Sequence, residues 1–176
     1  MKRTLRLLLA LPVILALGAA LVWGWLDATR VSAGGLPPLK TGDLVFQESG
    51  NTQSAAIALA SRSLYTHVGI VEIDSQGRLF VVEAAGPVRT VALNDWIAHG
   101  TAGRITVKRV KGLDDVQARK AIAAAHVYDG RPYDVYFTDD RETLYCSELV
   151  HLAFKEGAGL ELGAGQRVKD LHIANA

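Results

Sequence analysis

The stretch THVGIVEIDSQGRLFVVEA, residues 66–84, decides the fold of this chain. Two runs rich in β-branched and aromatic residues, 68–73 and 79–84, flank a turn-forming segment at 74–77. Short β-rich runs on either side of a glycine-containing loop are typical of a β-hairpin. We therefore predict two antiparallel strands joined by a tight loop.

The length of this loop decides which side chains share a face of the hairpin. A three-residue loop at 75–77, with Gly77 in the left-handed conformation, pairs Gly69 with Glu83. His67 and Glu83 then lie diagonally on one face, with about 7–8 Å between their Cα atoms. A carboxylate at that distance can fix the tautomer of the imidazole and stabilise the imidazolium. A loop of two or four residues would instead place the two side chains on opposite faces, with Glu83 an ordinary solvent-facing residue.

Segments on both sides of the hairpin complete an α+β pattern. Further strands are expected at 44–46, at 104–110 and at 88–91, where the last run either extends the second hairpin strand or starts a third. Helices are expected at 54–62, 93–99, about 114–128 and 146–155. In the first of these helices, Ala, Ile and Leu recur at helical spacing. This order predicts an α+β domain with helices grouped around a mostly antiparallel sheet.

The chain has a single cysteine, Cys146, at or just before the start of the last predicted helix. A disulfide within the chain is therefore impossible. A thiol at a helix N-terminus faces unpaired backbone N–H groups and the positive end of the helix dipole, and both stabilise the thiolate. The same N–H groups can stabilise an oxyanion. Cys146 is thus a candidate nucleophile; the alternative is a buried thiol that packs as a small apolar side chain.

His67 is the candidate base for this thiol. It begins a strand, and a strand is a rigid platform for a catalytic group. Gly69 beside it would leave room for a substrate or a neighbouring backbone. The other four histidines lie in predicted helices, at a helix end or in the C-terminal tail, without a chemical context: His99, His126, His151 and His172.

The N-terminus carries an uncharged apolar run from Leu7 to Leu26, preceded by three basic residues and ended by Asp27. A run of this length can span a bilayer as a helix, and its basic flank should stay cytoplasmic. We expect a cytoplasmic flank at 1–6, a transmembrane anchor at 7–26, a linker at 27–40 and a globular domain at 41–176. The alternative is a secretory signal cleaved after residues 31–33. Both interpretations place the domain outside the cytoplasm.

Charge and motif content argue against several classes of function. The formal net charge is +1 and the basic residues are scattered beyond the first few positions, so we expect no nucleic-acid partner. Metal-ligand spacings such as His-Glu-x-x-His, phosphate-binding loops and dinucleotide-binding fingerprints are absent from the sequence. We therefore expect neither a metal nor a cofactor.

Several separated blocks of the sequence resemble one enzyme family. The segments 130–133 (GRPY) and 145–150 (YCSELV) resemble the Gly-x-Pro-Tyr and Asp-Cys-Ser-Gly-Leu-Val signature of NlpC-type cysteine peptidases. In those enzymes the histidine follows the cysteine, whereas here the segment 66–71 precedes it, which is the pattern of circularly permuted members. The blocks are most similar to the YiiX-like branch, over roughly residues 41–155.

This resemblance implies a permuted papain-like α+β fold with a triad of cysteine, histidine and a polar group. It assigns the nucleophile to Cys146, the base to His67 and the orienting group to Glu83. Tyr133 matches a tyrosine that lines the site in NlpC-type enzymes and can help to hold the oxyanion. Tyr145 and Glu148 replace the aspartate and glycine of the signature, and both fit the permuted branch. We expect Asp43, in another matching block, to be structural and to accept hydrogen bonds from a turn.

The resemblance also implies a thiol-dependent hydrolase or acyltransferase that works through an acyl-enzyme. NlpC-type relatives cut peptide amides in bacterial cell walls, whereas the permuted lecithin retinol acyltransferase group acts on lipid acyl chains. Either substrate suits a domain anchored on the periplasmic side of a bacterial inner membrane. The alternative class is a non-catalytic module that binds a lipid or a peptide in the same groove.

Overall fold

The computed structural model describes residues 15–21, 33–50, 53–138 and 140–163. The chain divides into two compact units, Met1–Arg30 and Val31–Ala176. In the first unit, residues 15–21 are helical and exposed. Among the described residues, no helix is both long enough and apolar enough to cross a membrane. The remainder of the run expected as an anchor, 7–14 and 22–26, lies outside the described residues.

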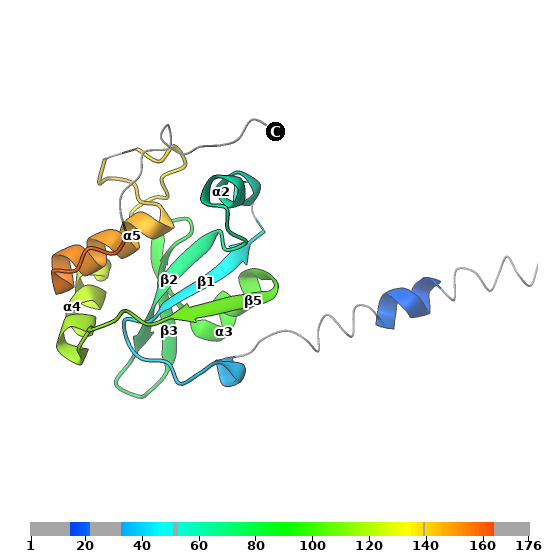
Figure 1. Cartoon of the computed structure of the whole chain (residues 1–176), viewed down its shortest axis with the longest axis horizontal. Helices are drawn as coiled ribbons and strands as arrows, with labels where there is room; N and C mark the ends of the chain where they lie inside the picture. Colours follow the sequence, from blue (N-terminus) through cyan, green and yellow to red (C-terminus); the bar gives the residue numbers. More distant parts are fainter. Residues whose placement is uncertain (1–14, 22–32, 51–52, 139, 164–176) are drawn as a thin grey trace, which may run out of the picture. The chain divides into compact units, whose positions relative to one another are not determined.

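The second unit is built on a five-stranded sheet whose strand order is β4-β3-β2-β1-β5 (Figure 1). All of its strand pairs are antiparallel, as the sequence predicts. The run at 88–91 starts a third hairpin strand. The strands are β1 (Leu44–Ser49), β2 (His67–Ile73), β3 (Leu79–Ala84), β4 (Val88–Ala92) and β5 (Gly100–Lys108).

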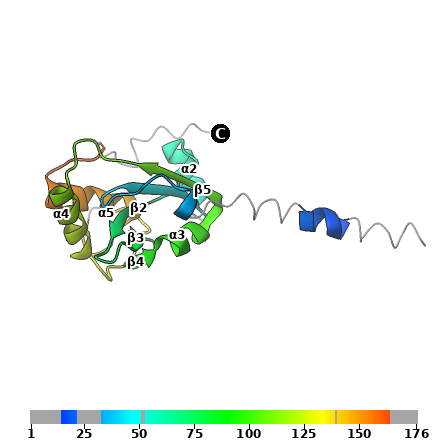
Figure 2. The ribbon, with the colours of Figure 1, turned by 90° about the horizontal axis from the view of Figure 1, so that it is seen from below.

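Helices cover the sheet, and Figure 2 shows α4 and α5 side by side. The helix α4 begins at a capping box, in which Asp114 and Gln117 each accept a backbone hydrogen bond from the other. The α-helices are α2 (Ser54–Ser61), α3 (Leu93–His99), α4 (Asp115–His126) and α5 (Cys146–Ala153); α5 continues into the π-helical turn η2 (Phe154–Ala158), and a short 3-10 turn η1 spans Ala33–Gly35. This arrangement confirms the predicted α+β class.

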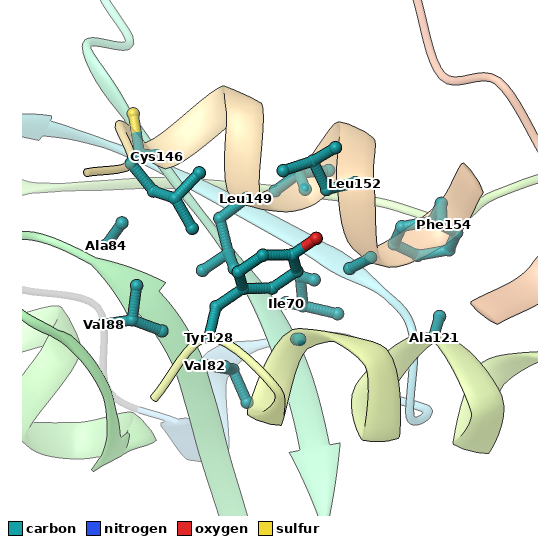
Figure 3. Close-up of a cluster of buried hydrophobic side chains, with 14 of the residues drawn as sticks. Ile70, Val82, Ala84, Val88, Ala121, Tyr128, Cys146, Leu149, Leu152 and Phe154 are labelled. Atoms are coloured by element: carbon teal, nitrogen blue, oxygen red, sulfur yellow. The ribbon is translucent and has the colours of Figure 1, made fainter. Parts of the chain in front are cut away.

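Apolar side chains fill both faces of the sheet, because successive residues of a strand point to opposite sides. On one face Ile70 and Val82 pack with Leu149 of α5, and Figure 3 shows this cluster. On the other face Val71 packs with Trp96 of α3. The central strand β2 is therefore buried on both sides, which positions its first residue, His67, inside the domain.

The hairpin has the predicted register. The strands β2 and β3 pair from Ile70↔Val82 to Ile73↔Leu79, and the same register places Gly69 opposite Glu83. The loop closes with a hydrogen bond from the Gly77 N–H to the Asp74 carbonyl, 3.0 Å long, and Gly77 has a φ of +77°. The glycine is required there because this left-handed conformation is costly for residues with a side chain.

Three segments refine the expectation. The helix α2 forms where predicted, and none of its residues is buried. Of the two alternatives expected for Gly69, the structure shows the close approach of a neighbouring strand and not space for a substrate: a Cβ added there would lie 2.3 Å from Val81 Cγ1 and 3.2 Å from the Val82 carbonyl oxygen of β3. Part of the expected linker also belongs to the domain, since Leu36 and Leu39 pack against the α3 side of the core.

Candidate active site

Cys146 is the first residue of α5, and its thiol is buried. The preceding residue, Tyr145, is extended and its side chain makes no capping hydrogen bond. The sulfur instead accepts hydrogen bonds from the backbone N–H groups of Ser147, in the first turn, and of Val68, on β2. Figure 3 shows the sulfur pointing away from the apolar cluster beneath the helix. The helix start thus presents the thiol to β2 in a polar setting.

His67 connects this thiol to a carboxylate. Its Nε2 lies 2.7 Å from Glu83 Oε2, which leaves Nδ1 for the hydrogen bond between the ring and the Cys146 thiol. The imidazole is only 8% exposed. Trp96 of α3 stacks against it, with the ring centroids 6.0 Å apart and the planes inclined by 29°. The ring is therefore held by three neighbours, two polar and one aromatic.

The environment favours a charged form of the Cys146–His67 pair. Burial is the largest single effect on His67 and lowers its pKa, but the hydrogen bonds and negative charges of Cys146 and Glu83 outweigh it and raise the pKa to about 9. Burial likewise raises the pKa of the Cys146 thiol, yet the His67 imidazolium and the two backbone N–H groups bring it below its ordinary value. Both shifts favour the thiolate–imidazolium form of the pair over the thiol–imidazole form.

Glu83 is held at both oxygens. Its Oε2 is the hydrogen-bond partner of His67 Nε2, and Oε1 lies 3.0 Å from Arg89 Nε and 2.9 Å from Arg89 Nη2. The carboxylate is 3% exposed, and burial raises its pKa, but the hydrogen bonds and charges of His67 and Arg89 together lower it below the usual range. Glu83 is thus a fixed anion behind the imidazole.

Tyr133 is a second side chain that makes a hydrogen bond with the Cys146 thiol. It pairs with Leu144 in a short parallel bridge that ties the segment before α5 to the segment around Tyr133. Burial, followed by the negative charge of Cys146, raises the pKa of the Tyr133 hydroxyl. Tyr133 therefore stays protonated and donates a hydrogen bond to the sulfur.

The structure brings the four sequence-selected site residues together: Cys146, His67, Glu83 and Tyr133. Sequence reasoning missed two of their neighbours. Arg89 had a usable signal, because the three-residue loop 85–87 obeys the same parity rule and places Arg89 directly opposite Glu83. Trp96 had none, since its contact with His67 depends on how α3 packs.

The remaining polar residues singled out in the sequence lie elsewhere. Asp43 is buried and structural, as expected: it accepts the Lys40 N–H at 2.8 Å and forms a two-nitrogen ion pair with Arg109. His126 forms ion pairs with Glu72 and Asp129 on the surface, and His172 lies outside the described residues. Within the described part of the chain, no group of three or more His, Cys, Asp or Glu side chains is arranged to hold a metal ion.

Known proteins share this sequence and fold. Residues 38–175 match the family model described as permuted papain-like amidase enzyme, YaeF/YiiX, C92 family. The uncharacterized protein YiiX of Escherichia coli strain K12 is 40% identical over 139 residues, which cover 77% of this chain and 67% of that protein. The crystal structure of the metalloprotein yiiX from Escherichia coli O157:H7 superposes with a TM-score of 0.74 at 39% identity, covering 77% of this chain and 76% of that one. The chain therefore belongs to the C92 family of permuted papain-like amidases, of the YaeF/YiiX type.

Proposed function

We propose that this protein is an amidase whose nucleophile is Cys146, with His67 as base and acid, Glu83 as orienting group and Tyr133 as oxyanion donor. One observation carries the proposal: a buried chain of hydrogen bonds runs from a thiol at a helix start through an imidazole to a carboxylate. Such a chain both generates a thiolate and holds the proton that a leaving amine needs. Membership of an amidase family supports the same reaction class.

In the acylation step, the Cys146 thiolate attacks the carbonyl carbon of the amide and forms the C–S bond. Negative charge moves to the carbonyl oxygen, where the Tyr133 hydroxyl stabilises it by hydrogen bonding. The proton on His67 Nδ1 then passes to the amide nitrogen, the C–N bond breaks and the amine leaves. Cys146 is left as a thioester and His67 as neutral imidazole, with Glu83 still bound at Nε2.

In the deacylation step, neutral His67 takes a proton from water, and the resulting hydroxide attacks the thioester carbonyl. The C–S bond breaks, the carboxylic acid product leaves and the thiolate–imidazolium pair is restored. Glu83 stabilises the imidazolium in both half-reactions. An alcohol or amine in place of water gives acyl transfer through the same intermediate.

Two classes of amide or ester suit this site. Peptide amides of the cell wall fit the amidase family, and we take them as the first candidate substrate. A lipid acyl substrate is the second, and the distribution of exposed apolar side chains favours it. Seven large apolar side chains are exposed in the described part of the second unit. Five of them lie in two segments: Leu59 and Leu64 in residues 59–64, and Val135, Tyr136 and Phe137 in residues 135–137.

The segment 135–137 contacts the residue before the proposed nucleophile, and a hydrogen bond connects it to the residue that precedes α2. Gln53, next to α2, donates from Nε2 to the Val135 carbonyl at 3.4 Å, which links α2 to the loop before α5. Phe137 packs on Tyr145, the residue before Cys146, with ring centroids 5.1 Å apart. Exposed apolar patches of this kind often mark binding surfaces. The acyl chain of a lipid substrate is a group that would cover these exposed apolar side chains.

We further propose that residues 7–26 anchor the protein in the bacterial inner membrane, with the amidase domain on the periplasmic side. The uncharged run and its basic N-terminal flank support this location. Cleavage after residues 31–33 would release the same domain into the periplasm.

The relative described as a metalloprotein raises the question of a metal at this site, and the donor groups do not fit one. Both ring nitrogens of His67 are occupied, one by Glu83 and one by Cys146, so the three groups form a chain rather than converging on one point. The proposed reaction therefore uses no metal-bound step.

The rate of alkylation of Cys146 as a function of pH tests the proposed function. Cys146 is the only thiol, so iodoacetamide uptake by the detergent-solubilised full chain reports this site alone. We expect the thiol to react with a midpoint well below the ordinary value of about 8.5, and to lose that depression in His67→Ala. A wild-type midpoint near 8.5 that ignores the histidine would contradict an activated pair. A screen of peptide and lipid amides, with Cys146→Ala as the inactive control, then separates the two substrate classes.

A further inference from the structure

Arg89 contacts Glu83, the carboxylate of the proposed triad. It faces Glu83 directly across the β3–β4 strand pair. Its guanidinium makes two close contacts with Glu83 Oε1, 3.0 Å from Nε and 2.9 Å from Nη2, while Oε2 stays 2.7 Å from His67 Nε2. The Arg89 side chain is 45% exposed and the Glu83 side chain only 4%. A cation at the surface therefore holds a carboxylate that is almost entirely buried.

We propose that Arg89 is a positioning residue for the Cys146–His67 pair, acting through Glu83. This inference rests on the proposed function of that pair. A carboxylate held at one oxygen can turn about its terminal bond, since such torsions are broad. In this structure Arg89 holds Oε1 while His67 holds Oε2, so both oxygens are fixed and the carboxylate cannot turn without breaking one of these contacts.

Arg89 is also the last of four neighbouring groups whose charges alternate in sign. The order from the helix start outward is thiolate, imidazolium, carboxylate and guanidinium, on Cys146, His67, Glu83 and Arg89. Without the last cation, the negative potential of Glu83 at the pair is stronger. A proton is then held more tightly on both His67 and Cys146, so the thiolate forms at higher pH.

In the described residues, the titratable side chains that act on the pair besides Glu83 are few. Tyr133 contacts the thiol, and Glu148 lies in the first turn of α5 but is not among the groups with the largest effects on the pKa of Cys146 or His67. The strand β1 contributes the uncharged Gln47, which pairs with His67, and α3 contributes the uncharged Trp96. Arg89 is thus a partly exposed cation that contacts the buried carboxylate of Glu83 and can act on the Cys146–His67 pair through it.

A purely structural role is the competing explanation, because an ion pair between neighbouring strands also ties β3 to β4. The two roles predict different results. Loss of a strand tie lowers the unfolding temperature and leaves the titration of Cys146 unchanged. Loss of a positioning cation raises the midpoint pH at which the Cys146 thiol titrates.

The test is the pH profile of Cys146 alkylation by iodoacetamide in the full chain, compared between wild type, Arg89→Gln and Arg89→Lys. We expect the midpoint of Arg89→Gln to rise by about half to one pH unit, a modest shift because the guanidinium is half exposed. Lysine keeps the charge but not the two-nitrogen contact, so Arg89→Lys should recover about half of that shift. Arg78→Gln is the matched control: Arg78 also pairs with a carboxylate, that of Asp74, but at the far end of the β2–β3 hairpin. Its midpoint should equal that of wild type.

The outcomes are separable. An Arg89→Gln midpoint equal to that of wild type, or a control that moves equally far, overturns the inference and leaves the amidase proposal standing. An unperturbed wild-type thiol overturns both. If Arg89→Gln does not fold, Arg89→Met provides a second neutral variant that keeps the aliphatic stem, and the same shift is required of it.

Discussion

Replacing Glu83 with glutamine removes one negative charge from behind His67 and keeps the size of the side chain. The charge lost is 2.7 Å from Nε2, and both side chains are less than a tenth exposed. An opposite charge at such a distance changes a pKa by about 1–3 units, equivalent to about 1.4–4 kcal/mol. We therefore expect the pKa of His67, which is raised to about 9 in the wild type, to fall to between about 6 and 8 in Glu83→Gln.

The direction of the effect on activity follows from the role of the imidazolium. His67 must be protonated to give a proton to the leaving amine, so amide turnover should decline as pH rises through the pKa of His67. In the wild type that decline begins near pH 9. In Glu83→Gln it should begin about 1–3 pH units lower.

Histidine proton resonances in the NMR spectrum of the full chain in detergent micelles measure this pKa directly, and His67→Ala identifies the signal. Glu72→Gln is the control, because Glu72 lies on the same strand but contacts His126, with Oε2 3.1 Å from Nε2. That change should lower the pKa of His126 and leave His67 as it is. If His67 still titrates near 9 in Glu83→Gln, the thiolate alone sustains the imidazolium and the orienting role of Glu83 is refuted.

Three further predictions concern the oxyanion donor, the packing of α4 and the N-terminus. Tyr133→Phe should lower amide turnover about 100- to 1000-fold in a steady-state assay, because the proposed oxyanion donor is lost; unchanged turnover would remove Tyr133 from the mechanism. Gly157→Ala should lower the free energy of unfolding by about 1–3 kcal/mol in a denaturant titration, since the new Cβ would lie 2.3 Å from the Lys120 carbonyl oxygen of α4; Gly86→Ala, which meets nothing within 4 Å, is the neutral control. The full chain should remain in the membrane pellet after a carbonate wash, whereas recovery of a shortened soluble form would favour a cleaved signal.

Local rules predicted part of the geometry of the candidate site. A three-residue hairpin loop, one of the loop lengths considered, places His67 and Glu83 on one face because the period of side chains along a strand is two residues, and the structure has the register of that loop. The start of α5 at Cys146 followed from the apolar spacing of the helix, and the turn-accepting role of Asp43 from its place in a matching block. In each case the structure depends on a few neighbouring residues and on a single turn or cap.

The features that sequence reasoning missed depend on contacts between distant elements. Periodicity predicted the α2 helix, but nothing in the pattern states whether a layer exists for its apolar face to pack against, and no residue of α2 is buried. Gly69 could be predicted to leave space, but the group that fills this space, the Val81 side chain, follows from how closely β3 approaches. Trp96 reaches His67 only because α3 packs on the same face of the sheet.

The order of the site residues along the chain has no effect on the proposed chemistry. The nucleophile comes from the start of α5, and the base and its carboxylate come from the hairpin β2–β3, which has already been completed when the chain reaches Cys146. What unites them is the packing of α5 against β2, where Leu149 and Ile70 are both fully buried in one cluster. That contact fixes the helix start beside the first residue of β2 whether the helix precedes or follows the strand in sequence. A permuted chain therefore preserves the thiol–imidazole–carboxylate geometry as long as it preserves the helix–sheet contact.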